Sequence, residues 1–490
     1  MKNKIILSLF LGSLLFSCSD SMFEENYSEA GLIVVDQNAL KNNADLERSI
    51  KGLYSKLSNT SGFGGDHFTY QELTGDIGFV SQSNSGYFVG TNGGTHIQVE
   101  GGAGGGLWNA FYNTIANANF VLGFDGKIPE DENAIHKNGE LFAHAKIIRA
   151  YNYMALLTYF SPNYGEGDQS LGVPYPTTYD IKAKLPRESV GKVIDNVIGD
   201  LEATLSYFEA NDIIGEIYSK KNSFSPLAVE LLLARAYLFK KDYVKAEYYA
   251  QKVIDDVSVP FLGRGAASQF FNSGEESADE TIFQLEFNSV TPQGLTDYWG
   301  TNSRYTQNFM ARAFWNIANP PGVTVTPATR DVRAYSWYMT NATVESTKYP
   351  DNPKPIDVRK YLSGSRDLIQ LRKSEAIFIK AEAQFHSNPS LASQTVTTWV
   401  KDKRFPAYVP SVTSGSEVLK EILTQKAYEF FLEGLRFSDL KRNNMTISKY
   451  QTNSTGQPLT VIPTGDRRFI WPIPLSEMQN NPNIKQAPGY

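Results

Sequence analysis

The feature that most constrains the fold of this 490-residue chain is a pair of amphipathic segments between residues 225 and 260. Ser225 followed by Pro226 is typical of a helix start, because serine caps the first turn and proline is tolerated at the first helical position. Two apolar stripes at helical spacing follow, separated by a turn at residues 240–242: Leu227, Leu231, Ala234 and Leu238, then Tyr243, Ala246, Ala250 and Val253. The pattern predicts two helices that pack closely against each other.

The spacing of small and aromatic residues makes this hairpin tetratricopeptide-like. The matching positions are Leu233, Ala234, Tyr237, Asp242, Tyr243 and Ala246. Further amphipathic patterns predict a helix over 44–57 and helices over 107–122, 141–160 and 189–208. We expect weaker hairpins from 141–160 with 189–208 and from 371–387 with 415–432. The chain is therefore predicted to be mainly α-helical.

Two segments interrupt the helical pattern, at residues 61–106 and 260–370. Glycine makes up nine of the 21 residues from Gly86 to Gly106. The run Gly101–Gly106 lacks both the dinucleotide glycine spacing and a following Lys-Ser/Thr, so we expect a flexible loop and no nucleotide site. In the second segment, residues 281–287 alternate as a short strand would. Both segments are interpreted as a loop-rich, short-strand insertion in a helical scaffold.

The only cysteine, Cys18, follows a short apolar run that two lysines precede at the N-terminus. That run is too short to span a bilayer and is typical of a signal peptide. Leu15 to Cys18 also fits a bacterial lipobox, apart from the bulky Phe16, and the alternative is an ordinary signal with a chance cysteine at its end. We predict a signal peptide over 1–17, a lipid-anchored tether over 18–43 and a single domain over 44–490.

Composition argues against several classes of function. The net charge of −6 disfavours nucleic-acid binding, and one cysteine excludes intramolecular disulfides and cysteine-based metal centres. The five histidines form no metal-ligating pair, and no nucleophile elbow is present, so no cofactor, metal or catalytic activity is expected. Carboxylates are plentiful, so a glycosidase pair remains an alternative.

Aromatic residues are abundant, with 29 Phe, 27 Tyr and 6 Trp, and many lie in the two irregular segments. Trp108 lies on a predicted helix and is expected in the core. Rings on loops among amides and carboxylates suit a sugar or peptide site, because a pyranose stacks its C–H face on an aromatic plane while polar groups bind its hydroxyls. The predicted ligand-binding residues are Asp76, Tyr87, Phe88, Tyr298, Trp299, Tyr305 and Trp337.

Motifs along nearly the whole chain resemble the SusD/RagB family, the surface nutrient-binding lipoproteins of Bacteroidetes. They include the lipobox, the helical hairpin and the run from Tyr428 to Phe437. The C-terminal residues 468–474 and 486–490, RFIWPIP and QAPGY, are the most specific. Residues 400–404 match the family's pattern loosely, and Ala427 and Tyr428 depart from it.

The resemblance implies a right-handed superhelix of tetratricopeptide-like hairpins, near 141–260 and 371–442, that supports an irregular ligand face from 61–106 and 260–370. It also implies a cell-surface, outer-membrane lipoprotein that is held by its lipid alone and passes oligosaccharide to a SusC-like TonB-dependent transporter. Two alternatives keep the scaffold: a peptide ligand, as in the RagB branch, or a protein-binding scaffold whose aromatic loops contact the transporter.

Overall fold

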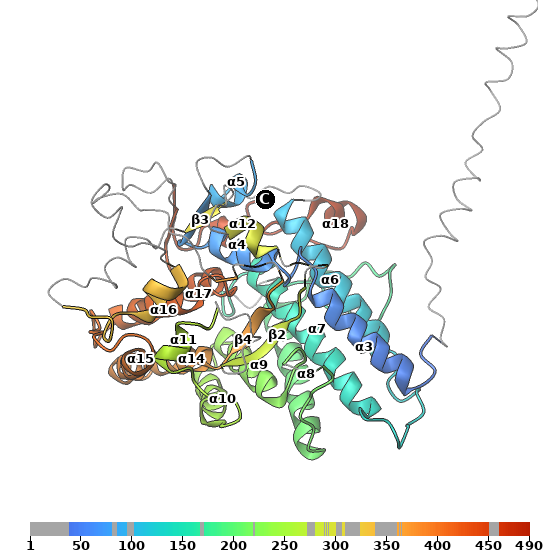
Figure 1. Ribbon diagram of the computed structural model, residues 1–490. Coiled ribbons are helices and arrows are strands. Elements are labelled where there is room, and N and C mark those ends of the chain that lie inside the picture. Colours follow the sequence, from blue (N-terminus) through green and yellow to red (C-terminus); the bar gives the residue numbers. More distant parts are fainter. Residues whose placement is uncertain are drawn as a thin grey trace, which may run out of the picture.

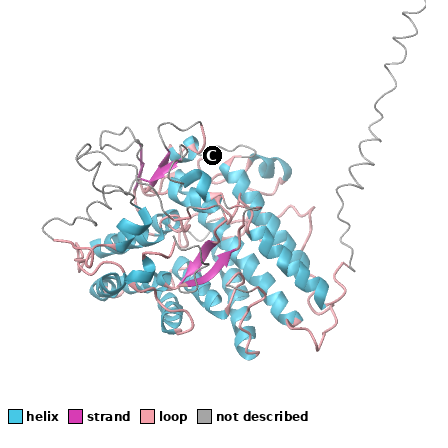
Figure 2. Ribbon diagram, viewed as in Figure 1, coloured by secondary structure: helices cyan, strands magenta, loops and turns pink. Residues whose placement is uncertain are grey.

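The computed structural model describes residues 39–80, 86–95, 102–166, 171–218, 221–271, 280–288, 290, 292, 294–299, 306–308, 324–338, 360–361, 363, 365–449 and 460–490. Helices dominate this part of the chain, and short strands occur in the loop-rich regions (Figure 2). The longer helices are α3 (Asn43–Leu57), α4 (Asp66–Thr74), α6 (Ala103–Leu122), α7 (Asn138–Phe160), α8 (Val190–Ala210), α9 (Pro226–Phe239), α10 (Tyr243–Asp255), α14 (Ser374–Phe385), α15 (Pro389–Lys403) and α16 (Glu417–Phe430). Shorter helical segments are α5 (Val89–Asn92), α11 (Arg264–Ala267), α12 (Leu295–Trp299), η1 (Ala334–Tyr338), α17 (Arg436–Arg442), η2 (Arg467–Phe469) and α18 (Leu475–Asn480).

The long helices pack in succession, as expected for a hairpin scaffold. Helix α7 contacts α6 and α8, α8 contacts α9, and α9 contacts α10, which in turn packs on α14 (Figure 1). Helices α4, α5 and α12 gather at one edge of this array, near the C-terminal end of the chain (Figure 1). The scaffold therefore presents an irregular face beside its helical layer.

The α9–α10 hairpin has the predicted start and turn. Ser225 caps α9 through its side chain, which accepts from the Ala228 amide, and Pro226 occupies the first turn. Asp242 caps α10 in the same way, accepting from Lys245 N at 3.1 Å. The small residues Ala246 and Ala250 are fully buried at the helix contact. The prediction of this hairpin is confirmed.

One prediction for the helices is wrong, and one helix was missed. Residues 103–106 form the first turn of α6, where we expected a flexible loop. A Cβ on Gly104 would lie 3.7 Å from both the Phe160 and the Trp471 ring, which is ordinary van der Waals contact, so this turn packs against both rings. Helix α15, which follows α14 directly, was not predicted. The expected packing of 371–387 against 415–432 is present as the contact of α14 with α16, and α15 packs against both helices.

The strands form two-stranded antiparallel sheets. They pair β1 (Gly78–Val80) with β3 (Thr306–Asn308), β2 (Thr281–Leu285) with β4 (Leu368–Arg372), and β5 (Ile447–Lys449) with β6 (Thr460–Ile462). All five residues of β2 are buried, so the strand does not have the exposed face that alternation predicts. In the part of the chain that the structure describes, no helix is long and apolar enough to cross a bilayer.

Candidate functional site

Four aromatic side chains from three separate segments meet on the irregular face. The Phe88 ring lies edge-on to Tyr298, with centroids 4.9 Å apart, and edge-on to Tyr70 at 5.6 Å. Tyr87 lies 6.3 Å from Phe88 and is 54% exposed. We name these four residues the aromatic cluster; it combines a buried base at Tyr70 with an exposed ring at Tyr87.

The segments that carry the cluster are fixed by backbone and amide contacts. Tyr70 lies on α4, Tyr298 on α12, and Phe88 directly precedes α5. Asn92 of α5 accepts a hydrogen bond from Val80 N in β1 at 3.2 Å, which ties α5 to the end of that strand. Gly294 N donates to Gly64 O at 3.4 Å, which places α12 beside the start of α4.

Phe88 has a left-handed backbone conformation, with φ of 59°. A non-glycine residue at positive φ costs about 1–2 kcal/mol, because Cβ approaches the following carbonyl. Such conformations persist where the surroundings hold them, and they concentrate at functional segments. Here the conformation keeps the Phe88 ring against Tyr70 and Tyr298.

A carboxylate accompanies the cluster. Asp66 begins α4, one turn before Tyr70, and burial raises its pKa to about 6. Burial and the charge of Asp66 raise the pKa of Tyr70. Among the described residues, none donates a hydrogen bond to the Asp66 side chain, so its oxygens are available to a hydroxyl donor.

The predicted site residues divide into several groups. Tyr87, Phe88 and Tyr298 lie together in the aromatic cluster. Asp76 has a different role from the predicted one, because Arg436 occupies its carboxylate: Nε donates to Oδ1 at 2.7 Å and Nη2 donates to Oδ2 at 2.8 Å. This bidentate pair joins the α4–β1 turn to α17, so we assign Asp76 to the structural framework.

Trp299 and Trp337 lie in the core and offer no ring face to a ligand in this conformation. Trp299 is 4% exposed, packs edge-on against Phe431 and donates from Nε1 to Thr69 at 3.1 Å. Trp337 is fully buried and donates from Nε1 to the Ala267 carbonyl at 2.8 Å. Both indoles are satisfied by packing and a hydrogen bond within the protein, which corrects the prediction of a sugar-stacking role.

Trp337 adjoins a network of buried charges. Glu429 Oε1 forms ion pairs with Arg372 Nη1 at 2.7 Å and with Arg404 Nη2 at 2.9 Å. Both arginines also form ion pairs with Glu280. These cations hold the pKa of Glu429 well below its usual range despite its burial. Tyr305 and Cys18 lie outside the described residues.

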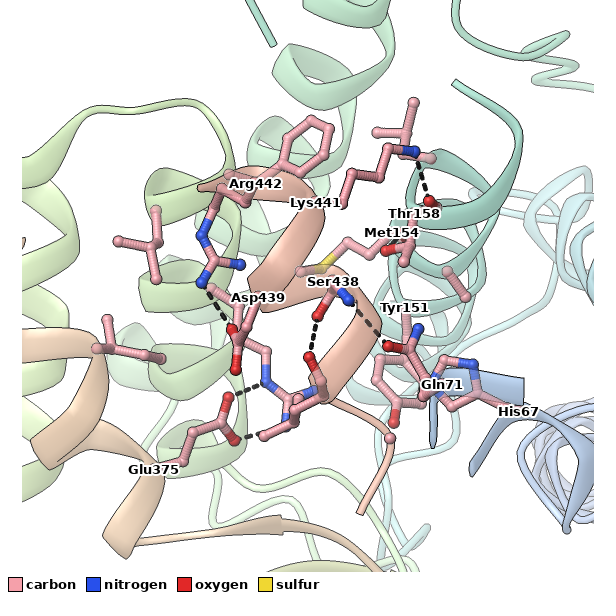
Figure 3. Close-up of a pocket in the computed structure, with 18 of the residues that line it drawn as sticks. His67, Gln71, Tyr151, Met154, Thr158, Glu375, Ser438, Asp439, Lys441 and Arg442 are labelled. Carbon is pink, nitrogen blue, oxygen red and sulfur yellow. Dashed lines mark hydrogen bonds and ion pairs between the residues drawn. The ribbon is translucent and has the colours of Figure 1, made fainter. Parts of the chain in front are cut away.

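A cavity of about 90 Å³ lies inside the helical scaffold, between α4, α7, α9, α14 and α17 (Figure 3). His67, Gln71, Tyr151 and the Arg235–Glu375 ion pair line it. Burial lowers the pKa of His67 to about 3, so the imidazole is neutral. The cavity has room for a few waters but not for a glycan chain. Buried Gln71 Nε2 has no acceptor among the described residues and is a partner for such a water.

Sequence reasoning missed Asp66 and did not select Tyr70. A helix predicted over 66–74 would have revealed the pair, because residues four apart lie on the same helix face. Within the described ranges, no group of three or more His, Cys, Asp or Glu side chains is placed to hold a metal ion.

Comparison with known proteins gives matches along most of the chain. A family described as "SusD family" matches residues 293–490, and one described as "Starch-binding associating with outer membrane" matches residues 34–239. The starch-binding protein SusD of Bacteroides thetaiotaomicron is 30% identical over 148 residues, which span 30% of this chain and 25% of that protein. SusD-like protein P38 of Formosa agariphila is 22% identical, over 78% of this chain and 79% of its own length.

Solved structures share the fold. A SusD superfamily protein from Bacteroides vulgatus has a TM-score of 0.77 at 22% identity, covering 92% of this chain and all of that one. A SusD-like carbohydrate-binding protein from the same organism has a TM-score of 0.70 at 18% identity, with 91% and 98% covered. The two family matches, the relatives and the shared mainly α fold together show that this chain belongs to the SusD/RagB family.

Proposed function

We propose that this protein is a surface-exposed, non-catalytic lipoprotein that binds oligosaccharide and delivers it to a TonB-dependent outer-membrane transporter. The observation that carries the proposal is the aromatic cluster with Asp66 beside it, on the irregular face. An exposed tyrosine ring can stack on a sugar, while the carboxylate accepts from sugar hydroxyls. The names of relatives, which describe binding of starch and carbohydrate, support a glycan as the ligand.

The first experiment measures binding of the purified mature chain to a panel of oligosaccharides by isothermal titration calorimetry. We expect Tyr87→Ala to weaken the binding of whichever glycan the wild type binds by at least about tenfold, because a stacked ring is a typical anchor of a ligand. Tyr248→Ala is the matched control, because Tyr248 is 58% exposed but lies on α10. Equal affinities of Tyr87→Ala and Tyr248→Ala would refute the site.

A peptide library on the same protein decides the alternative ligand. Binding of peptides with no binding of any glycan would replace oligosaccharide by peptide in the proposal. A scaffold that binds only protein would bind neither. Incubation of a bound glycan with the protein, followed by product analysis, tests the proposal that the protein has no hydrolase activity.

Two further parts of the proposal concern anchoring and delivery. We propose that Cys18 carries the lipid, that residues 1–17 are removed, that 18–43 form the tether and that 44–490 form one domain. Palmitate labelling that is lost in Cys18→Ala, together with release of the protein from the membrane fraction, is the expected result. Co-purification from native outer membranes is expected to yield a TonB-dependent transporter, and its absence would count against delivery.

A further inference from the structure

A second hollow lies beside the irregular face, with a volume of about 750 Å³. One side is the end of α3 and the residues after it, up to Thr60, and the other is the end of β2 and the residues after it. We name this hollow the polar groove. Its lining residues include Tyr54, Thr60, Tyr218, Asn222 and Glu286. The volume lies in the range of about 300–1,000 Å³ that ligand sites occupy.

The polar groove contains a buried acceptor that the described residues do not satisfy. Asn222 is 8% exposed, and within the described ranges no group donates a hydrogen bond to its Oδ1. Asn222 Nδ2 donates to Glu286 Oε2 at 3.5 Å. Flipping the amide would exchange Nδ2 and Oδ1 and place Oδ1 against the carboxylate, which cannot donate a hydrogen bond to it. A buried polar atom without a partner is costly, so Oδ1 marks a position where a donor from a ligand or water belongs.

The neighbours of Asn222 suit a ligand rich in hydroxyl groups. Glu286 is exposed and adds a second acceptor. Burial and the charges of Glu286 and Glu47 raise the pKa of Tyr218 to about 12, so its hydroxyl remains a donor at neutral pH. The half-buried Tyr218 ring stands edge-on to Tyr54, with centroids 5.7 Å apart. An aromatic ring, two acceptors and a hydroxyl donor are groups that recognise a saccharide.

The position of Asn222 is fixed by the fold, which makes it a built feature. Lys221 O accepts from Gln284 N of β2 at 3.1 Å. Ser223 donates from Oγ to Gly215 O at 2.9 Å. Both neighbours of Asn222 are thus bound to the surrounding backbone, and the amide is held at the edge of β2.

Thr60, at one end of the polar groove, lies close to the aromatic cluster. A Cβ on Gly294 would lie 2.9 Å from the Thr60 methyl and 3.8 Å from the Tyr298 ring, so Gly294 is close to both residues. We propose that the polar groove is a second saccharide subsite, which holds further units of the glycan chain bound at the aromatic cluster. This inference rests on the proposed glycan-binding function.

The test measures affinity against chain length for wild type, Asn222→Leu and Glu286→Gln, with maltooligosaccharides from the disaccharide upwards as the first series. We expect wild-type affinity to rise with length, and each variant to lose about three- to tenfold for long chains while binding the shortest ligand as wild type does. Thr204→Val is the control for Asn222→Leu, because Thr204 Oγ1 is also buried with no hydrogen-bond partner in the described part of the chain, but lies on α8. Glu132→Gln, on an exposed loop, is the control for Glu286→Gln.

Thermal unfolding without ligand separates binding from folding. Because Asn222→Leu removes an unsatisfied acceptor, its melting temperature should equal or exceed that of wild type. If the wild type binds the series and both variants bind every chain length with wild-type affinity, the subsite is refuted. The proposed function would still hold in that case. If wild type binds no oligosaccharide of the panel, the proposed function fails and the subsite falls with it.

Discussion

Replacing Asp76 by asparagine separates the structural role that we assign to it from the ligand-binding role that the sequence suggested. The Asp76 side chain is 26% exposed and that of its partner Arg436 is 11% exposed. Asparagine keeps the shape but removes the charge, so Arg436 would remain in the interior with the Leu423 carbonyl as its other acceptor, at 3.0 Å. We therefore expect lower stability with unchanged ligand affinity.

The magnitude follows from the burial of the pair. Breaking a fully buried ion pair by removing one partner costs about 3–5 kcal/mol. Partial exposure of Asp76 and the remaining hydrogen bonds of Arg436 reduce this to about 2 kcal/mol. With about 2.1 cal/mol/K of unfolding entropy per residue, a domain of about 450 residues loses about 1 °C per kcal/mol, so the melting temperature should fall by about 2 °C.

The assay combines thermal unfolding by far-ultraviolet circular dichroism with calorimetric titration of the glycan that binds best. Glu188→Gln is the control, because Glu188 and Lys192 form an i, i+4 ion pair at the surface. Such a pair should contribute less than about 0.5 kcal/mol to the free energy of unfolding. A variant with wild-type melting temperature and at least tenfold weaker glycan binding would refute our assignment and restore Asp76 as a ligand contact.

Three further predictions concern the surroundings of the site. Phe88→Gly should be more stable than Phe88→Ala by about 1 kcal/mol, because glycine tolerates φ of 59°, while both lose glycan affinity; equal stabilities in denaturant titrations would contradict this. Burial raises the pKa of Glu72 to about 8, so its contribution to stability is full below pH 4.5 and is lost as the pH rises toward 8. Glu72→Gln should therefore be more stable than wild type at pH 8 but not at pH 4, and a pH-independent difference in unfolding free energy would oppose this reasoning. Lys449→Met should cost about 2 kcal/mol, because the ammonium donates to the Leu73 and Gly75 carbonyls at the end of α4; unchanged urea unfolding would argue against that role.

Local signals made the scaffold predictable. Capping by Ser225 and the stripe that begins at Leu227 act within a few residues, so the sequence alone predicts α9. Helix α15 was missed although the segment carries helix signals: Asn388 caps it by accepting from Leu391 N, and the buried Ala392, Val396, Trp399 and Val400 have helical spacing. Two Ser and three Thr residues lower the helix propensity of Pro389–Lys403. The first turn of α6 was missed because glycine disfavours helices, whereas the packing of this turn against Phe160 and Trp471 involves segments distant in sequence.

The site was predictable only in part, because burial of loop aromatics depends on distant segments. Trp299 packs on Phe431 and Trp337 binds the Ala267 carbonyl, contacts that no local pattern shows. Composition alone does not distinguish Tyr87 from Trp337 as a ligand contact, although Tyr87 is exposed and Trp337 is buried. The clustering of Tyr87, Phe88 and Tyr298 followed from the two irregular segments being adjacent, which the family resemblance implied.

The measurement that tests the central claim most directly is a crystal structure of the protein with the oligosaccharide that the panel identifies as its tightest ligand. We expect a sugar ring against the exposed Tyr87 ring, a sugar hydroxyl within hydrogen-bond distance of Asp66, and the chain extending past Thr60 into the polar groove. A fully occupied oligosaccharide elsewhere on the protein, with the aromatic cluster bare, would contradict the site on which the proposed function rests.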